Sequence, residues 1–429
     1  MKDIATYALE ALKKAGADKA SCTVSKGRTD EFNIHANEFS LLRTLFSDSI
    51  SMKALVGGRK GVATVNKLDR DSIDEAVENC MKLANSAQPD EAEDIAPLAE
   101  NRTFDDSCGG ADLAKLFEES RRYLETVREQ FPKVNIDEFV AKFNSGEYAY
   151  ANSNGVVFDG KSESYNFYSM FLGKDGEKMT SFNGTGGTMK NLDRPFIDFP
   201  LHRQQLEDAV KSLDTRMVDG KFTGKVIVTP TCPDIWYAMH GILLSDGSLI
   251  EGTSQWKDAL GTQVASPMLT LRTVPNSPHI VNGQRYTADG FIAQDEDIIK
   301  DGVLKAFCLG LYGANKTGKP RAKNTSFSVE IAPGGTPLAD MIAGIDRGIL
   351  INRFSGASPG PSGEVTGVAK NSFLIENGKV TDALMETMVS FNILDALKNI
   401  AAISKETVMD GGSILPWVCF DGITVSGKQ

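Results

Sequence analysis

Asn-Gly and Asp-Gly pairs divide this chain into two parts, because none occurs before residue 154 and about a dozen occur after it. Such pairs favour the primed two-residue turns that join antiparallel strands, so they predict β-hairpins. Clear examples are Asp175-Gly176, Asn282-Gly283, Asp301-Gly302 and Asn377-Gly378. The later part of the chain is therefore predicted to be mainly antiparallel sheet.

The residues before 154 switch between helical and strand spacing. An apolar stripe predicts a helix over 3–15, which Gly16 ends. A second helix is predicted over 71–87, with Asp71 as its N-terminal cap. Between the two helices, four short alternating runs predict four strands, near residues 22–24, 32–36, 50–56 and 62–65.

The segment 87–110 has a different composition, rich in Pro, Gly and acidic residues, and it predicts a solvated connector. Helical spacing resumes over 112–131, and Pro132 prevents the helix from continuing. A strand is expected over 138–143.

We predict an α+β fold in two domains. Residues 1–220 are expected to form an N-terminal α/β layered domain, and residues 221–429 a mainly antiparallel, barrel-like domain. The boundary near residue 220 precedes an expected strand over 225–228. Two helices, near 204–213 and 384–402, are expected to interrupt the later strands.

The net charge of −11 disfavours binding to nucleic acid or to an anionic membrane. Apolar stretches such as 349–351 are far shorter than the roughly 20 residues that a membrane helix needs. The N-terminus lacks the basic end and unbroken apolar core of a secretory signal. The six cysteines contain no C-x-x-C pair, which favours reduced thiols. We expect a cytoplasmic protein.

Two short motifs resemble catalytic or nucleotide-binding sequences. Residues 356–360 match the G-x-S-x-G pattern of hydrolases, but Pro359 cannot donate the N–H that such a site needs, so a surface loop is favoured. Residues 313–320 nearly match a phosphate-binding loop, but Pro320 stands where a hydroxyl should hold Mg²⁺. A basic turn is favoured there.

The histidines do not predict a metal site. No two of His35, His202, His240 and His279 have the spacing with which one helix presents two imidazoles. Cys232 and His240 could meet across a loop and a helix, but two packed side chains are the favoured interpretation. No metal and no cofactor is predicted for this chain.

Several segments together resemble the TldD/PmbA family, known as modulators of DNA gyrase and as two-subunit metallopeptidases. Their order and spacing match over nearly the whole chain. The segments are Ser49–Ala63, Asn152–Gly155, Gly252–Ser254, Lys300–Lys305, Phe354–Gly356 and Phe373–Val380.

The zinc-binding branch of that family carries an H-E-x-x-x-H helix and a distant cysteine ligand. Counting back from Gly252, Tyr237 and Ile242 stand at the two histidine positions and Ala238 at the glutamate position. Met409 stands at the cysteine position. With these ligands and the general base missing, no catalytic residue is predicted, and the chain resembles the PmbA (TldE) branch.

The resemblance implies a non-catalytic subunit of a zinc peptidase that acts on unfolded peptides, in peptide maturation or protein degradation. The partner would be a zinc-bearing TldD-like chain, and the peptide would be held as an added strand. Three alternatives stay open: a stand-alone homodimeric peptide-binding adaptor without proteolysis, a regulator of DNA gyrase, and a hydrolase with an unconventional site.

Overall fold

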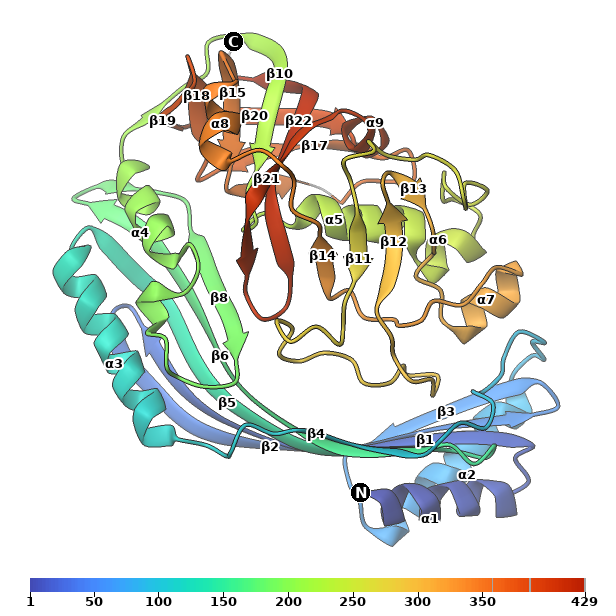
Figure 1. Ribbon diagram of the computed structural model, residues 1–429. Coiled ribbons are helices and arrows are strands. Elements are labelled where there is room, and N and C mark those ends of the chain that lie inside the picture. Colours follow the sequence, from blue (N-terminus) through green and yellow to red (C-terminus); the bar gives the residue numbers. More distant parts are fainter. Residues whose placement is uncertain (357, 386, 428–429) are drawn as a thin grey trace.

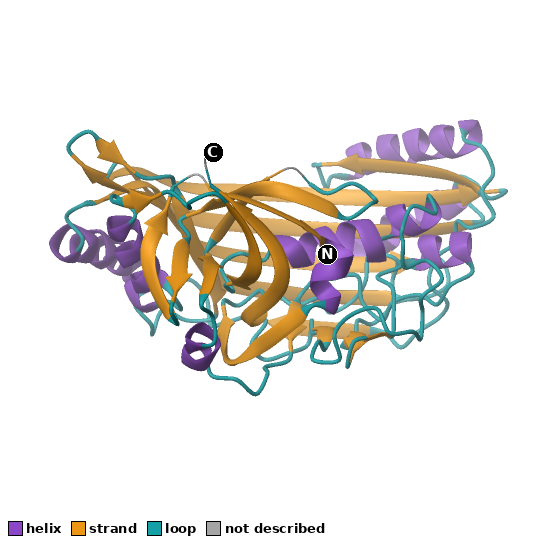
Figure 2. Cartoon of the chain, turned by 90° about the horizontal axis from the view of Figure 1, so that it is seen from above, coloured by secondary structure: helices purple, strands orange, loops and turns teal. Residues whose placement is uncertain are grey.

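The computed structural model describes residues 1–356, 358–385 and 387–427. They form two curled, mainly antiparallel sheets with helices packed against them. Figure 1 shows the first sheet curving around the second half of the chain, and Figure 2 shows the molecule from above. The predicted α+β fold, layered in its first part and rich in strands in its second, is confirmed.

All strands before residue 190 belong to the first sheet. They are β1 (Lys19–His35), β2 (Glu38–Val56), β3 (Arg59–Val65), β4 (Arg102–Asp106), β5 (Val134–Asn152), β6 (Val157–Asp175), β7 (Lys178–Met179) and β8 (Asn183–Met189). The order is β3-β2-β1-β5-β6-β4, and β7 and β8 also pair with β6. The strand predicted over 138–143 is part of β5.

Three helices pack on the outer side of this sheet (Figure 1): α1 (Lys2–Lys14), α2 (Arg70–Ser86) and α3 (Leu113–Gln130). They confirm the three helices predicted before residue 132. The cap of α2 is not Asp71, as predicted, but Asp69, whose carboxylate accepts a hydrogen bond of 3.0 Å from the Ser72 amide. Asp71 lies in the first turn, where its charge still favours the helix.

The strands predicted near residues 22–24 and 32–36 are parts of one strand, β1. The structure therefore has three strands here, β1, β2 and β3, where four were predicted. The predicted break between the first two contained Gly27 and Asp30, but Asp30 and the next residue, Glu31, are both buried in the middle of β1. Arg28 binds Asp30, and Arg43 of β2 binds Glu31. Buried charges persist when they are paired. The ion pairs of Glu31 cross strands, so local periodicity could not reveal them.

The segment 87–110 is not the solvated connector that its composition predicted. It contains β4, and it buries Ala92, Ile95 and Ala96. Glu93 is also buried, and its carboxylate lies 2.7 Å from the Lys53 ammonium and also binds Lys60. The segment packs because its charges are neutralised by lysines of the adjacent strands.

The second sheet contains the remaining strands. They are β9 (Thr215–Arg216), β10 (Lys221–Val228), β11 (Leu271–Thr273), β12 (Glu296–Lys300), β13 (Val303–Leu304), β14 (Val329–Ile331), β15 (Arg347–Ile351), β16 (Arg353–Gly356), β17 (Glu364–Lys370), β18 (Phe373–Glu376), β19 (Lys379–Leu384), β20 (Thr387–Asn392), β21 (Ile400–Met409) and β22 (Ile414–Ser426). The long strand β22 pairs with β10, β14, β20 and β21, which curls the sheet on itself.

The other helices are short. They are η1 (Phe196–Asp198), α4 (His202–Lys211), α5 (Asp234–Met239), the π-helix η2 (His240–Leu244), α6 (Asp246–Ile250), α7 (Leu311–Thr317), α8 (Leu338–Ala343) and α9 (Ile393–Lys398). The helix predicted near 204–213 is α4. The helix predicted over 384–402 is wrong for most of its length, because β20 and β21 flank the short α9. Val389 pairs with both β17 and β22, and such contacts override local helical spacing.

Some of the Asp-Gly and Asn-Gly pairs form the predicted tight turns. Asp301-Gly302 joins β12 to β13, Asn377-Gly378 joins β18 to β19, and both residues of each pair have positive φ. Other pairs lie elsewhere: Asp246-Gly247 begins α6, and Asp421-Gly422 lies within β22. The pairs predicted the strand-rich character of this part but not the position of each turn.

His202 lies at the centre of a buried polar network beneath the first sheet. Its Nδ1 lies 2.9 Å from the Phe196 carbonyl oxygen, which can only accept, so Nδ1 carries the proton. Its Nε2 lies 3.2 Å from the Tyr123 hydroxyl, which lies 2.7 Å from the Ser169 hydroxyl. Burial lowers the pKa of His202 from 6.5 to about 4. The imidazole is therefore neutral at pH 7.

Acid is expected to destabilise the fold through His202. Between pH 6.5 and 4 the unfolded chain takes up a proton at this residue and the folded chain does not, so stability is lost as the pH falls. The full contribution is roughly 3 kcal/mol. Urea unfolding from pH 7 to pH 4.5 should show a smaller loss for His202→Phe than for the wild type. Equal losses in the two proteins would contradict this role.

Candidate functional site

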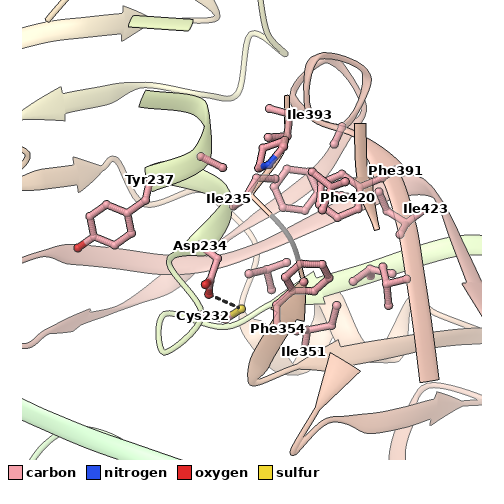
Figure 3. A pocket seen from close by; sticks show the side chains of 18 of the residues that line it. Cys232, Asp234, Ile235, Tyr237, Ile351, Phe354, Phe391, Ile393, Phe420 and Ile423 are labelled. Atoms are coloured by element: carbon pink, nitrogen blue, oxygen red, sulfur yellow. Dashed lines mark hydrogen bonds between the residues drawn. The ribbon is translucent and has the colours of Figure 1, made fainter. Parts of the chain in front are cut away.

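An apolar cavity of about 520 Å³ lies in the second half of the chain, within its main hydrophobic core (Figure 3). Strands β10, β15, β16, β17, β20 and β22 and the helices α5, η2 and α9 form its walls. Its lining is mainly branched aliphatic and aromatic: Val226, Val228, Ile235, Ile242, Ile351, Phe354, Val365, Val389, Phe391, Ile393, Phe420 and Ile423. The cavity can hold an apolar group.

A buried thiol and a carboxylate lie next to each other in the cavity wall at the start of α5. The Cys232 thiol is buried and donates a hydrogen bond of 3.3 Å to Oδ2 of Asp234. Burial raises the pKa of this thiol well above its usual value, and the Asp234 charge raises it further. Cys232 is therefore a protonated thiol and not an activated nucleophile.

Three of the four residues that the family resemblance predicts at the degenerate zinc positions lie on one wall of the cavity. Tyr237 and Ala238 belong to α5, Ile242 belongs to η2, and all three line the cavity together with Gly241. In a regular α-helix, residues five apart are rotated by about 140° from each other. A π-helix brings such residues onto the same side. The π-turn therefore accounts for the shared wall.

Tyr237 lies at the rim of this wall and is half-exposed. Its ring extends away from the aromatic side chains of the cavity (Figure 3), and its centroid lies 5.5 Å from that of Phe327. Burial raises the pKa of its phenol, and the carboxylate of Asp410 raises it further. Asp410 follows Met409, which ends β21, so the fourth degenerate position lies at the end of a strand near α5.

His240 and Cys232 do not form a site. The His240 ring packs on Phe327 with centroids 4.5 Å apart, and burial lowers its pKa. Within residues 1–356, 358–385 and 387–427, no group of three or more His, Cys, Asp or Glu side chains is placed to hold a metal ion. In the same ranges, no helix has the length and apolarity required to cross a membrane.

The serine of the G-x-S-x-G match lies at the cavity, but without catalytic partners. Gly356 ends β16, Ala357 lies outside the described residues, and Ser358 and Pro359 line the cavity from a loop. In the described part of the chain, no histidine or carboxylate is hydrogen-bonded to Ser358, and no helix follows it directly. This geometry fits a surface loop better than it fits a catalytic nucleophile at Ser358.

The near match to a phosphate loop is a helix and not the basic turn that was predicted. Residues 311–317 form α7, and Gly318 ends it with a φ of +67°. Lys316 lies 2.9 Å from the Asp90 carboxylate of the first half. Most of the motif is therefore helical and does not form a loop around a phosphate.

Comparisons with known proteins bear on the family of the chain. Residues 222–427 match the model of the PmbA/TldA metallopeptidase C-terminal domain. The metalloprotease PmbA homolog of Haemophilus influenzae is 21% identical over 100% of this chain and 96% of its own length. The chain belongs to the PmbA/TldD family. The metalloprotease PmbA of Escherichia coli O157:H7 is 22% identical, with 97% and 95% covered.

Solved structures share the fold of this PmbA/TldD family chain over its full length. TldE from Thermococcus kodakarensis has a TM-score of 0.85 at 20% identity, with 100% of both chains covered. A protein of Bacteroides thetaiotaomicron described as a modulator of DNA gyrase has a TM-score of 0.88 at 21% identity, with 100% of this chain and 99% of that chain covered.

The sequence placed the degenerate positions but missed the cavity behind them. Ile351, Val365, Val389 and Phe420 come from four strands, and each looks like an ordinary core residue in its own run. Phe354-Ser355-Gly356 was noticed as one of the family's segments, and it does line the cavity. That segment, residues 237–242 and the G-x-S-x-G match were all noticed in the sequence, but nothing local showed that they meet at one cavity.

Proposed function

We propose that this chain is the non-catalytic subunit of a two-subunit peptidase. Its partner is a zinc-bearing member of the same family, and its substrate is unfolded peptide. The observation that supports this most is the wall formed by Tyr237, Ala238 and Ile242. A π-turn places them on one cavity wall. They stand where the family's zinc motif would be, and none of the three is a side chain that usually binds zinc.

The π-turn gives this observation its weight. A π-turn is uncommon and is typically retained at functional sites. The H-E-x-x-x-H spacing separates its two histidines by five residues, so such a turn is what lets both imidazoles reach one ion. Here the turn is present over His240–Leu244, although a phenol and an aliphatic side chain occupy the two positions. The backbone fits a zinc helix that has lost its ligands.

The side chains present do not fit Zn²⁺. A raised pKa keeps the phenol of Tyr237 protonated, and neither Ala238 nor Ile242 has a lone pair to offer. The thioether of Met409 is a poor ligand for Zn²⁺, which prefers thiolate, imidazole and carboxylate. We therefore assign no metal-dependent step to this chain. Its contribution is to complete the enclosure in which the partner cuts.

Reconstitution tests the proposal. The isolated chain is expected to contain no stoichiometric zinc and to cleave no unfolded peptide. A mixture with a zinc-bearing relative should form one complex on gel filtration and cleave the peptide until a chelator is added. Stoichiometric zinc with chelator-sensitive cleavage by the isolated chain would overturn the proposal, as would a pair that neither associates nor cleaves faster than the relative alone.

A cysteine variant separates this function from an unconventional hydrolase. Cys232→Ser removes the one thiol that lies beside a carboxylate in the cavity wall, and it changes the side-chain volume little. The reconstituted pair should keep its cleavage rate, because the protonated thiol takes no part. Loss of cleavage in a variant with an unchanged melting temperature would show that the chain contributes a nucleophile.

A further inference from the structure

The cavity beside the degenerate zinc positions has an exposed part and a buried part. The exposed part of its lining, called the mouth below, consists of Asp234, Tyr237, Gly241, Ser355, Gly356 and Ser358. Farther in, side chains such as Val365, Val389, Ile393 and Ile423 are at most 5% exposed. An apolar group that passes the mouth therefore leaves water for an apolar surrounding, which favours its binding.

The cavity has room for the largest side chains. An apolar cavity of about 150 Å³ is enough to bind benzene. The present cavity, at about 520 Å³, is more than three times as large as that. A benzyl or an indole group of a ligand can therefore enter it whole.

Aromatic rings stand between the mouth and the buried part. Phe354 of β16 and Phe391 of β20 are partly buried, and their ring centroids lie 6.4 Å apart in a T-shaped arrangement (Figure 3). A Cβ at Gly356 would lie 2.7 Å from Cε1 of Phe354, and a Cβ at Gly367 would come even closer to Cζ. The two glycines face each other across β16 and β17 and leave space for this ring. A further ring can make edge-to-face contacts with this pair.

The mouth is acidic. Oδ2 of Asp234 accepts the hydrogen bond of Cys232, whereas Oδ1 binds no residue that the structure describes. Burial and the carboxylates of Asp410 and Asp234 raise the pKa of the Tyr237 phenol, so both charges lie near the mouth. Among the described residues, the lining contains no Lys, Arg or His. A cation on a ligand is therefore favoured at the mouth.

We propose that this cavity is a specificity pocket, which binds an aromatic side chain of an unfolded peptide that carries Lys or Arg two residues away. The proposal deepens the proposed function and rests on it for the peptide as the source of the ring. In an extended peptide, residues two apart point to the same side and lie about 7 Å from each other. The ring then enters the cavity while the cation lies beside Asp234.

Calorimetric titration of the isolated wild-type chain tests the pocket without a zinc-bearing partner. The probe is an unlabelled peptide of Gly and Ser that contains Phe-Ser-Arg once. Replacing its Phe by Ala should weaken binding by at least about tenfold, because the buried ring is lost. Replacing its Arg by Glu should weaken binding by roughly fivefold, because an ion pair in contact with water contributes less. Equal affinities for the Phe and Ala peptides would overturn the proposal.

Filling the cavity tests where the ring binds. Ala238→Phe places a ring inside the cavity wall and should weaken binding of the Phe peptide by at least about tenfold. Ala401→Phe is the matched control, because Ala401 is exposed on β21 and does not line the cavity. Gly241→Phe is a second filling variant, since a Cβ there meets no atom within 4 Å. Melting curves identify the folded variants, and undiminished binding by a folded filling variant would overturn the proposal.

A charge variant tests the cation at the mouth. Asp234→Asn should remove most of the difference between the Arg and Glu peptides, whereas Asp258→Asn should preserve it. Asp258 is also an exposed carboxylate of the second half, but it does not line the cavity. An unchanged difference in Asp234→Asn would overturn the assignment of the cation. Binding of free indole without binding of the Phe peptide would overturn the peptide as the occupant.

Reconstitution with the zinc-bearing relative separates this proposal from the proposed function. The pair should cleave the Phe peptide with a lower KM than the Ala peptide, and Ala238→Phe should abolish that preference. A pair that cleaves both peptides with the same KM would overturn the specificity pocket and leave the proposed function standing. An isolated chain that binds the Phe peptide but forms no pair would support the pocket and overturn the proposed function.

Discussion

A chain that carries Tyr237→His, Ala238→Glu, Ile242→His and Met409→Cys is expected to bind about one zinc ion, whereas the wild type binds none. Two imidazoles and a thiolate are the three protein ligands that a catalytic zinc site needs, and a carboxylate beside them can act as the base. The measurement is metal analysis after extensive dialysis.

The geometry of the wild-type chain supports this expectation. The π-turn places residues 237 and 242 on one cavity wall. The charge of Asp410 acts on the phenol of Tyr237, so the end of β21, where Met409 lies, is near the same wall. The three ligand positions therefore come from one helical segment and from the end of one strand.

The matched control keeps Met409 and carries the three helix substitutions alone. With only two protein ligands it should bind zinc roughly tenfold more weakly or worse. Both variants must keep the far-ultraviolet circular dichroism of the wild type. A folded four-substitution variant without zinc would show that these positions are not a lost zinc site, and it would remove the main support for the proposed function.

The substitution Phe139→Ala is expected to lower the free energy of unfolding by about 3–5 kcal/mol. Phe139 is fully buried in β5, and its ring stacks on Tyr123 of α3 with centroids 4.6 Å apart. It also contacts Phe167 and Phe196. Truncation would leave a cavity between the first sheet and α3, and aromatic rings on three sides cannot all move in to fill it.

Phe139→Leu is the matched control, because it keeps most of the apolar volume and should cost only about 1–2 kcal/mol. Urea unfolding at pH 7, where the neighbouring His202 is neutral in both proteins, gives the comparison. Equal costs for the two substitutions would mean that the surrounding rings collapse around the site, contrary to the expectation.

Elements whose signals are local could be predicted without the structure. The apolar stripes of α1, α2 and α3 predicted helices that the structure contains. Positive φ at Asp301-Gly302 and Asn377-Gly378 is a property of those residue pairs, so the hairpins could be predicted without tertiary contacts. The family segments, and the degenerate positions from Tyr237 to Ile242, were also visible, because order and spacing along a chain require no structure.

Features that depend on contacts between residues far apart in the sequence could be seen only in the folded chain. The segment around Asp30 predicted a break between strands. Thr44 of β2 binds Asp30, however, and Lys142 of β5 binds Glu31, so β1 continues through both residues. The cavity needs walls from six strands, and β3 pairs with only part of β2 because it stops at Val65. Each of these features depends on which residues meet across a long stretch of sequence. Local periodicity shows only on which side of its own helix or strand a residue lies.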